Sequence, residues 1–147
     1  MMLLALVLFA CKGPCEPGSD PSLDIGYGWN AFTPAEDGQE VELVYGQQGG
    51  FHIELAVATT ELDASDLVSA SFSGKLDGQV VAEAQPWFSL ECDPISNTQQ
   101  AAGLRLIFWD LLPPDLDGQT IDVSGSVLDA RGETASATKS FVVIDPL

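Results

Sequence analysis

Short apolar or alternating runs, separated by clusters of Gly, Pro, Asp and Asn, make up most of this chain. No stretch carries the long apolar pattern of period 3.6 that an amphipathic helix needs. Alternating runs bounded by turn residues are typical of β-strands. The sequence therefore predicts an all-β domain with strands at Asp24–Tyr27, Glu40–Tyr45, Phe51–Thr59, Leu67–Ser73, Gln79–Ala84, Trp87–Glu91, Leu104–Trp109, Thr120–Leu128 and Thr134–Ile144.

Length and charge narrow the class of protein further. The 147 residues suit a single domain, and 46% hydrophobic residues are enough to build one core. Only 5 Lys and Arg oppose 22 Asp and Glu, which gives a formal net charge of −17. The electrostatic field of this negative charge repels the phosphate backbone of a nucleic acid, so we expect no nucleic-acid partner.

The triplet Asp-Gly-Gln occurs three times, starting at Asp37, Asp77 and Asp117. Little else is shared between the segments around the three triplets, which argues against a structural repeat. An Asp-Gly pair supplies the positive φ angle that a tight turn requires. We therefore interpret the triplets as recurrent turns, each placed just before a strand.

The C-terminal segment holds two predicted strands around a turn at Asp129–Gly132, with Ile121, Val123 and Val127 on one face of the first strand. A strand, an Asp-x-x-Gly turn and a final strand resemble the terminal F–G hairpin of bacterial immunoglobulin-like domains. The resemblance implies that residues 23–147 form an immunoglobulin-like antiparallel β-sandwich of about seven to nine strands. Such domains typically serve adhesion, spacing or ligand presentation.

The N-terminus indicates export. Met1–Ala10 is an apolar run that extends only about 15 Å as a helix, too short to span a membrane. The sequence Leu-Phe-Ala-Cys that ends at Cys11 resembles a bacterial lipobox, which implies a lipoprotein signal peptide over residues 1–10 and a lipid such as palmitate on Cys11. Lys12 follows that cysteine where Asp would retain a lipoprotein at the inner membrane, so the resemblance implies the outer membrane.

A segment rich in Gly, Pro and Ser, residues 11–22, reads as a tether between the lipid and the domain. Cys15 in this segment and Cys92 in the domain form an even pair in an oxidising compartment. Two interpretations stay open: a disulfide that staples the tether to the domain, or two unpaired thiols.

The single histidine, His52, follows a Gly-rich turn and begins a predicted strand. The pattern Gly-x-Gln-Gly-Gly-aromatic-His resembles a segment of uncharacterised lipoproteins of Gram-negative bacteria, over roughly residues 24–57, and this resemblance implies no activity. Strand alternation puts His52 and Glu54 on the exposed outer face and their odd-numbered neighbours in the core. We interpret His52 as ordinary surface, with a copper or zinc ligand as the alternative.

Acidic loops raise the question of calcium. The residues around Gly118 do not match an EF-hand loop, because positions one and twelve would be Pro113 and Ser124. A site of another kind at one end of the sandwich remains an alternative, with Ca²⁺ as its ligand and Asp63, Asp66, Asp115 and Asp117 as the metal-binding residues.

No catalytic motif stands out, since the serines lack a Gly-x-Ser-x-Gly context and no phosphate-binding Gly-rich loop leads into a helix. We therefore expect no enzyme and no resident cofactor. Trp29 and Tyr27 lie among glycines and form a candidate surface for a carbohydrate or protein partner. The sequence thus predicts a lipid-anchored, non-enzymatic envelope domain that acts as an interaction or structural module. The alternative is a periplasmic module that binds a small ligand or Ca²⁺.

Overall fold

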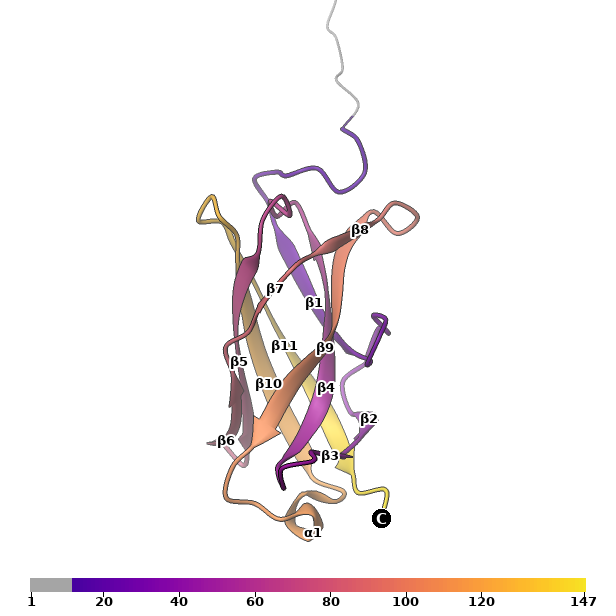
Figure 1. The fold of residues 1–147 in the computed structure, drawn as a ribbon, viewed down its shortest axis with the longest axis vertical. Coiled ribbons are helices and arrows are strands. Elements are labelled where there is room, and N and C mark those ends of the chain that lie inside the picture. The colour runs from indigo at the N-terminus through magenta and orange to yellow at the C-terminus, as the bar shows by residue number, and fades with distance from the viewer. Residues whose placement is uncertain (1–11) are drawn as a thin grey trace, which may run out of the picture.

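The computed structural model describes residues 12–147, and the signal peptide and lipidation site expected at residues 1–11 lie outside them. This part of the chain is all-β apart from one short helix, as the sequence predicts (Figure 1). No helix within residues 12–147 has the length and apolarity needed to cross a membrane. The elements are β1 (Ser22–Tyr27), β2 (Gln39–Glu42), β3 (Val44–Tyr45), β4 (Phe51–Thr60), β5 (Val68–Leu76), β6 (Gln79–Ala84), β7 (Trp87–Phe88), β8 (Glu91–Asp93), β9 (Thr98–Phe108), α1 (Pro113–Leu116), β10 (Thr120–Leu128) and β11 (Thr134–Ile144).

The strands form one continuous sheet in the order β1-β4-β9-β6-β5-β10-β11-β2. All pairs along this path are antiparallel except β11 with β2, which is parallel. The short strands β3, β7 and β8 pair with β4, β5 and β9, respectively. The sequence predicted two packed sheets, whereas the β5–β6 hairpin joins the two halves into one sheet.

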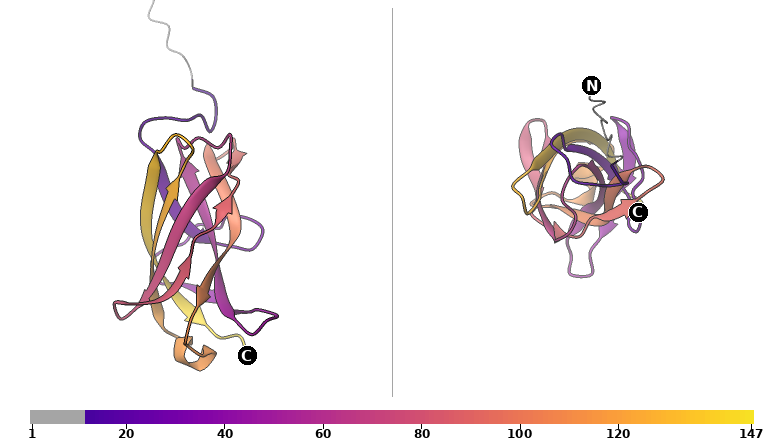
Figure 2. Two further views of the ribbon diagram at one scale, coloured as in Figure 1. Left: turned by 60° about the vertical axis from the view of Figure 1, so that its left-hand side comes forward. Right: turned by 90° about the horizontal axis from the view of Figure 1, so that it is seen from above.

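The sheet curls until it is nearly closed into a barrel, as Figure 2 shows in the view from above. Strands β1 and β11 lie side by side at the closure without a ladder between them in the described residues. Lys139 of β11 spans this seam: its Nζ lies 3.4 Å from Asp24 Oδ1 of β1 and donates a 2.8 Å hydrogen bond to the Ala35 carbonyl. The seam is therefore held by side chains and a loop.

Alternation along the strands fills the barrel. Ile121, Val123 and Val127 of β10 are fully buried, which confirms the predicted inward face of this strand. Gly125 takes the remaining inward position, where an added Cβ would lie 2.7 Å from the buried Phe72 ring. The missing side chain at this position leaves room for the ring to pack at the centre of the core.

Predicted and observed strands agree best where alternation is regular, and three of them match to the residue: Gln79–Ala84, Thr120–Leu128 and Thr134–Ile144. The three Asp-Gly-Gln turns are also confirmed, because Gly38, Gly78 and Gly118 all have positive φ. Three predictions need correction. The strand expected at Glu40–Tyr45 is divided between β2 and β3. Strand β9 begins six residues before Leu104, and the strand expected at Trp87–Glu91 is divided between β7 and β8.

The connections gather at two ends of the barrel (Figure 1). Residues 12–21, the β4–β5 connection, the β8–β9 turn and the β10–β11 turn share the upper end in that view, which we call the tether end. The β3–β4 hairpin, the β5–β6 turn, α1 and the C-terminus share the opposite end.

Candidate functional site

A groove of about 700 Å³ lies on the outer face of the sheet where β4 and β9 pair. Its lining comes from outward-facing residues of both strands, from the β3–β4 hairpin, and from the loop that follows β1. We call it the β4–β9 groove. The side chains that matter for its chemistry are Trp29, Tyr45, Gln47, Gln48, His52, Glu54, Arg105 and Ile107.

His52 lies on the outer face of β4, as its alternation with the buried Ile53 predicts, but the expected exposure is wrong. Only 7% of His52 is exposed, because Val44 of β3 and Ile107 of β9 flank it on either side in the ladder. Its Nε2 atom is buried and has no hydrogen-bond partner within residues 12–147. The sequence missed this burial because it depends on the pairing of Val44 with His52, which alternation along one strand does not reveal.

Glu54 and Arg105 face each other directly across the β4–β9 ladder. The Glu54 carboxylate lies toward the imidazole, with Oε1 3.5 Å from His52 Nε2. The Arg105 guanidinium lies instead over the indole of Trp29, with its carbon 5.9 Å from the ring centroid, a cation–π contact. In the part of the chain that the structure describes, no ion pair joins Glu54 and Arg105.

Two glycines fix the loop that carries Trp29. The Gly103 N–H of β9 donates a 2.9 Å hydrogen bond to the Gly28 carbonyl, and the Gly28 N–H donates one of 3.2 Å to the main-chain carbonyl of Glu54. Gly103 has φ of +70°, and an added Cβ would lie 2.7 Å from the Trp29 carbonyl oxygen. Glycine at this position therefore allows the loop to lie against β9, with 62% of Trp29 still exposed.

Tyr45 closes the groove on the hairpin side. Its ring meets that of Phe51 edge-to-face, with centroids 5.2 Å apart and planes at 85°. Its hydroxyl donates a 2.6 Å hydrogen bond to Asp145 Oδ1, which with burial and the carboxylate charge raises the pKa of Tyr45 to about 12. The hairpin is thus tied to the C-terminal segment.

The expected Trp29–Tyr27 surface is only partly assembled. Trp29 lines the groove, whereas Tyr27 is half-buried and packs against the core. The apolar run of the predicted strand Leu104–Trp109 predicts a buried Trp109, but 49% of this residue is exposed. The strand has already ended at Phe108, so Trp109 lies beyond the covered part of the sheet.

The four aspartates considered for calcium do not come together. Asp63 and Asp66 lie in the β4–β5 connection at the tether end, whereas Asp115 and Asp117 lie in and just after α1 at the opposite end. Asp63 Oδ1 accepts from the Ser65 N–H, and Asp117 Oδ1 accepts from the Asp145 N–H. Within residues 12–147 no group of three or more His, Cys, Asp or Glu is arranged to hold a metal, which also applies to His52.

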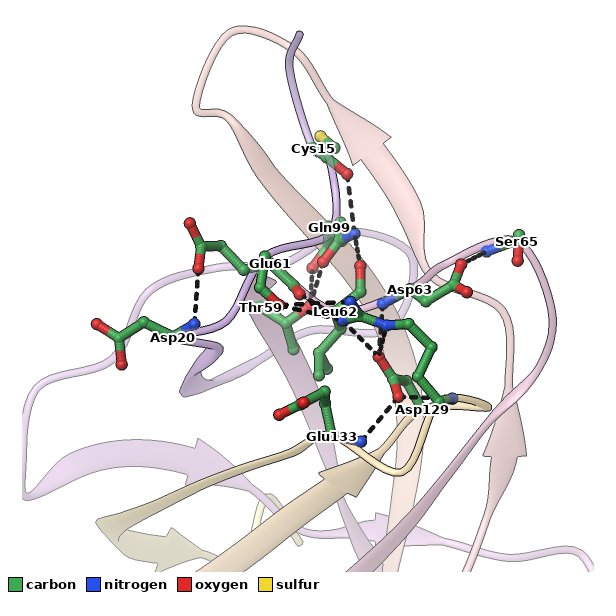
Figure 3. Close-up of polar contacts among 12 residues, drawn as sticks. Cys15, Asp20, Thr59, Glu61, Leu62, Asp63, Ser65, Gln99, Asp129 and Glu133 are labelled. Atoms are coloured by element: carbon green, nitrogen blue, oxygen red, sulfur yellow. Dashed lines mark hydrogen bonds and ion pairs between the residues drawn. The ribbon is translucent and has the colours of Figure 1, made fainter. Parts of the chain in front are cut away.

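The segment expected to be a tether is fastened to the barrel. Cys15 and Cys92 form a disulfide, and the Cys15 N–H donates a 2.8 Å hydrogen bond to Asn97 Oδ1. The buried Gln99 amide donates to the carbonyls of Cys15 and Leu62, at 3.1 and 2.6 Å (Figure 3). Sequence reasoning missed Gln99 because a buried glutamine carries no local signal.

Further contacts join the segment to Glu61 in the β4–β5 connection. Glu61 accepts a 2.8 Å hydrogen bond from the Asp20 N–H, and its Oε1 lies 3.4 Å from Lys12 Nζ. These two interactions, in that order of strength, lower the pKa of the Glu61 carboxyl. The chain from Lys12 onward therefore lies against the tether end.

Asp129 organises the loops beside this segment. Its buried carboxylate accepts hydrogen bonds from the N–H groups of Asp63, Arg131 and Glu133, and from the Arg131 guanidinium at 3.0 Å (Figure 3). Burial alone raises the pKa of Asp129, but these hydrogen bonds outweigh it and lower the pKa below 3.8. Arg131 also donates to the Glu61 carbonyl, so one ion pair links the β10–β11 turn to the β4–β5 connection.

The β4–β9 groove is the part of the described chain where aromatic, charged and amide side chains converge around an unpartnered buried nitrogen. Two sequence signals pointed to it: Trp29 among glycines, and the Gly-rich run Gly46–Gly50, which forms the turn of the hairpin that covers His52. No protein-family model matches the chain, and no curated protein matches its sequence.

Proposed function

We propose that this protein is a lipid-anchored, non-enzymatic domain of the bacterial outer membrane that acts as an interaction module through the β4–β9 groove. One observation carries the proposal. The segment that follows Cys11 is fastened at the tether end, and the groove is lined by the β3–β4 hairpin. This hairpin lies at the opposite end of the barrel (Figure 1). A lipid on Cys11 therefore leaves the groove on the side away from the membrane.

The short distance between anchor and cross-link supports this orientation. Cys11 lies four positions before Cys15, so its Cα is at most about 14 Å from the cross-linked residue even in a fully extended chain. The disulfide then limits how far the domain moves from the bilayer surface. An interaction surface that has to reach outward is best placed at the end opposite the anchor, where the β3–β4 hairpin lies.

The strand order supports an immunoglobulin-like fold as the finer description of the barrel. The half β1-β4-β9-β6 has the chain order of strands A, B, E and D of such a domain, and β5-β10-β11 has that of C, F and G. In this assignment the β5–β6 hairpin is the link that makes the two sheets continuous. Immunoglobulin-like domains commonly present ligands or partners, which agrees with an interaction module.

Intact mass and membrane fractionation in a lipoprotein-processing Gram-negative host test the anchor. The wild-type chain is expected to lose residues 1–10, to carry an acyl mass on Cys11 and to sediment with the outer membrane. Cys11→Ala is expected to lack the acyl mass and to leave the membrane fraction. The double variant Cys15→Ser/Cys92→Ser is the matched control, because it removes two other cysteines and keeps the acylated one.

Two results would contradict the proposal. One is an unprocessed or unacylated wild-type chain, and the other is Cys11→Ala that remains in the outer membrane fraction. Wild-type protein that sediments with the inner membrane would contradict only the proposal that Lys12 directs the protein to the outer membrane.

A further inference from the structure

The β4–β9 groove combines an exposed aromatic ring with polar groups of both kinds, and this combination limits what it can bind. Trp29 offers a large exposed indole surface, and Ile107 adds a second exposed apolar side chain to the lining of the groove. Because Gly28 is hydrogen-bonded through its main chain to both Gly103 and Glu54, the backbone of the loop that carries Trp29 is fixed. A preformed loop loses less conformational entropy on binding than one that the ligand has to order.

The charges in the groove balance each other. Arg105 supplies a positive donor and Glu54 a negative acceptor at directly opposed positions of the ladder. Neither is neutralised by the other, since the guanidinium lies over Trp29 and the carboxylate lies toward His52. A groove with one charge of each sign favours neither an anion nor a cation, and the net charge of −17 further disfavours polyanions.

The remaining polar groups are hydrogen-bonding groups without a fixed charge. The amides of Gln47 and Gln48 are exposed on the hairpin and can both donate and accept. His52 lines the groove, and its buried Nε2 has no hydrogen-bond partner within residues 12–147, with Glu54 Oε1 3.5 Å away. A buried polar atom without a hydrogen bond is costly in a folded protein. A ligand hydroxyl that reached this nitrogen would remove that cost.

We propose that the β4–β9 groove binds a neutral carbohydrate, with one sugar ring stacked on Trp29 and its hydroxyls paired with Arg105 and Glu54. Sugar hydroxyls both donate and accept hydrogen bonds, and the apolar face of a pyranose matches an exposed indole. The volume of about 700 Å³ falls in the usual range for a small-ligand site. This inference deepens the proposed interaction module by naming the chemistry of its ligand.

Binding of the purified full chain to soluble neutral oligosaccharides tests the inference by isothermal titration calorimetry. The probes are oligomers of glucose, mannose and N-acetylglucosamine, with polygalacturonate as an acidic polymer and a polyglycine peptide as a non-sugar polymer. At least one neutral oligosaccharide is expected to bind, and Trp29→Ala is expected to weaken that affinity at least about tenfold. Arg105→Lys is expected to weaken it as well, because lysine keeps the charge but loses the planar fork.

Trp87→Ala is the matched control, since Trp87 is 71% exposed on β7 and lies outside the groove. It is expected to bind as the wild-type chain does, and thermal unfolding of each variant verifies that it is folded. The inference is overturned if no neutral probe binds at about 10 mM, if Trp29→Ala keeps the affinity, or if polygalacturonate or the peptide binds better. Because the assay is independent of acylation, its failure is distinguishable from failure of the anchor experiment.

Discussion

Removal of the Cys15–Cys92 disulfide is expected to cost this barrel a large share of its stability. The two residues are 77 positions apart, so the cross-link closes a loop that covers more than half of the chain. The chain-entropy relation for a loop of this length gives about 4.5 kcal/mol at 25 °C through restriction of the unfolded state. Removal of a native disulfide from a small secreted domain typically costs about 2 to 5 kcal/mol, so we expect a loss of about 3 to 4.5 kcal/mol here.

The measurement is urea unfolding of the full chain in a Cys11→Ser background, which removes the third thiol and prevents disulfide exchange. Cys15→Ser/Cys92→Ser is added to this background, and the two proteins are compared with and without reductant. The cross-linked protein is expected to lose stability on reduction, whereas the variant without the pair does not respond. The slope of the unfolding free energy against urea is expected to rise in the variant, because its unfolded state expands.

The backbone contacts of residue 15 give this experiment its discriminating power. Serine keeps the hydrogen bonds to Asn97 and Gln99, since both involve main-chain atoms of Cys15. The difference therefore reports the covalent link itself. A decrease in the free energy of unfolding of less than about 1 kcal/mol would refute the reasoning. It would mean that residual contacts restrict the unfolded chain even without the disulfide.

Further predictions concern the loops and the core. Asp129→Ala leaves three backbone N–H groups without their acceptor and is expected to lower the unfolding free energy by about 3 kcal/mol in urea titrations. Because the pKa of Asp129 is lowered in the folded state, its stabilisation is present above the unfolded pKa of about 3.9 and is lost as the pH falls through the folded value. Acid titration should accordingly show a shallower loss of stability below about pH 4 in Asp129→Asn, and an unchanged slope would contradict this role. Gly125→Ala should cost about 1 to 3 kcal/mol by displacing the Phe72 ring, while Ser124→Ala on the outer face should change stability by less than about 0.5 kcal/mol.

Local sequence patterns predicted the strands whose hydrophobic alternation is regular. They failed for segments that become strands only because neighbouring strands pair with them. The hairpin of β10 and β11 follows from alternation and from a turn whose residues suit it, so both strands match to the residue. The first half of β9, from Thr98 to Gly103, is polar or small and has weak strand propensity of its own. It is ordered by β8 on one side and β4 on the other, which are contacts that no local window contains.

The candidate site was predictable in its residue types but not in its arrangement. Alternation correctly assigned His52 and Glu54 to the outer face, while the cover over His52 depends on the β3–β4 hairpin. The contact of Arg105 with Trp29 joins residues that are far apart in sequence and depends on the approach of two glycine-containing segments. The predicted calcium site was wrong because its four aspartates come from segments at opposite ends of the barrel. The acidic composition of a loop does not reveal which end of a barrel it occupies.

The cross-link also determines which strand bears a mechanical load. A pull on the chain ahead of Cys15 passes through the disulfide to Cys92 in β8 and from there into β9. Strand β9 is paired with β4 along most of its length and with β6 only near Phe108, so the β4–β9 ladder takes most of the force. Without the link the same pull would reach β1 first and could peel this edge strand from β4 one residue pair at a time. The disulfide thus transmits the load to β9, an interior strand, and the edge strand β1 does not bear it.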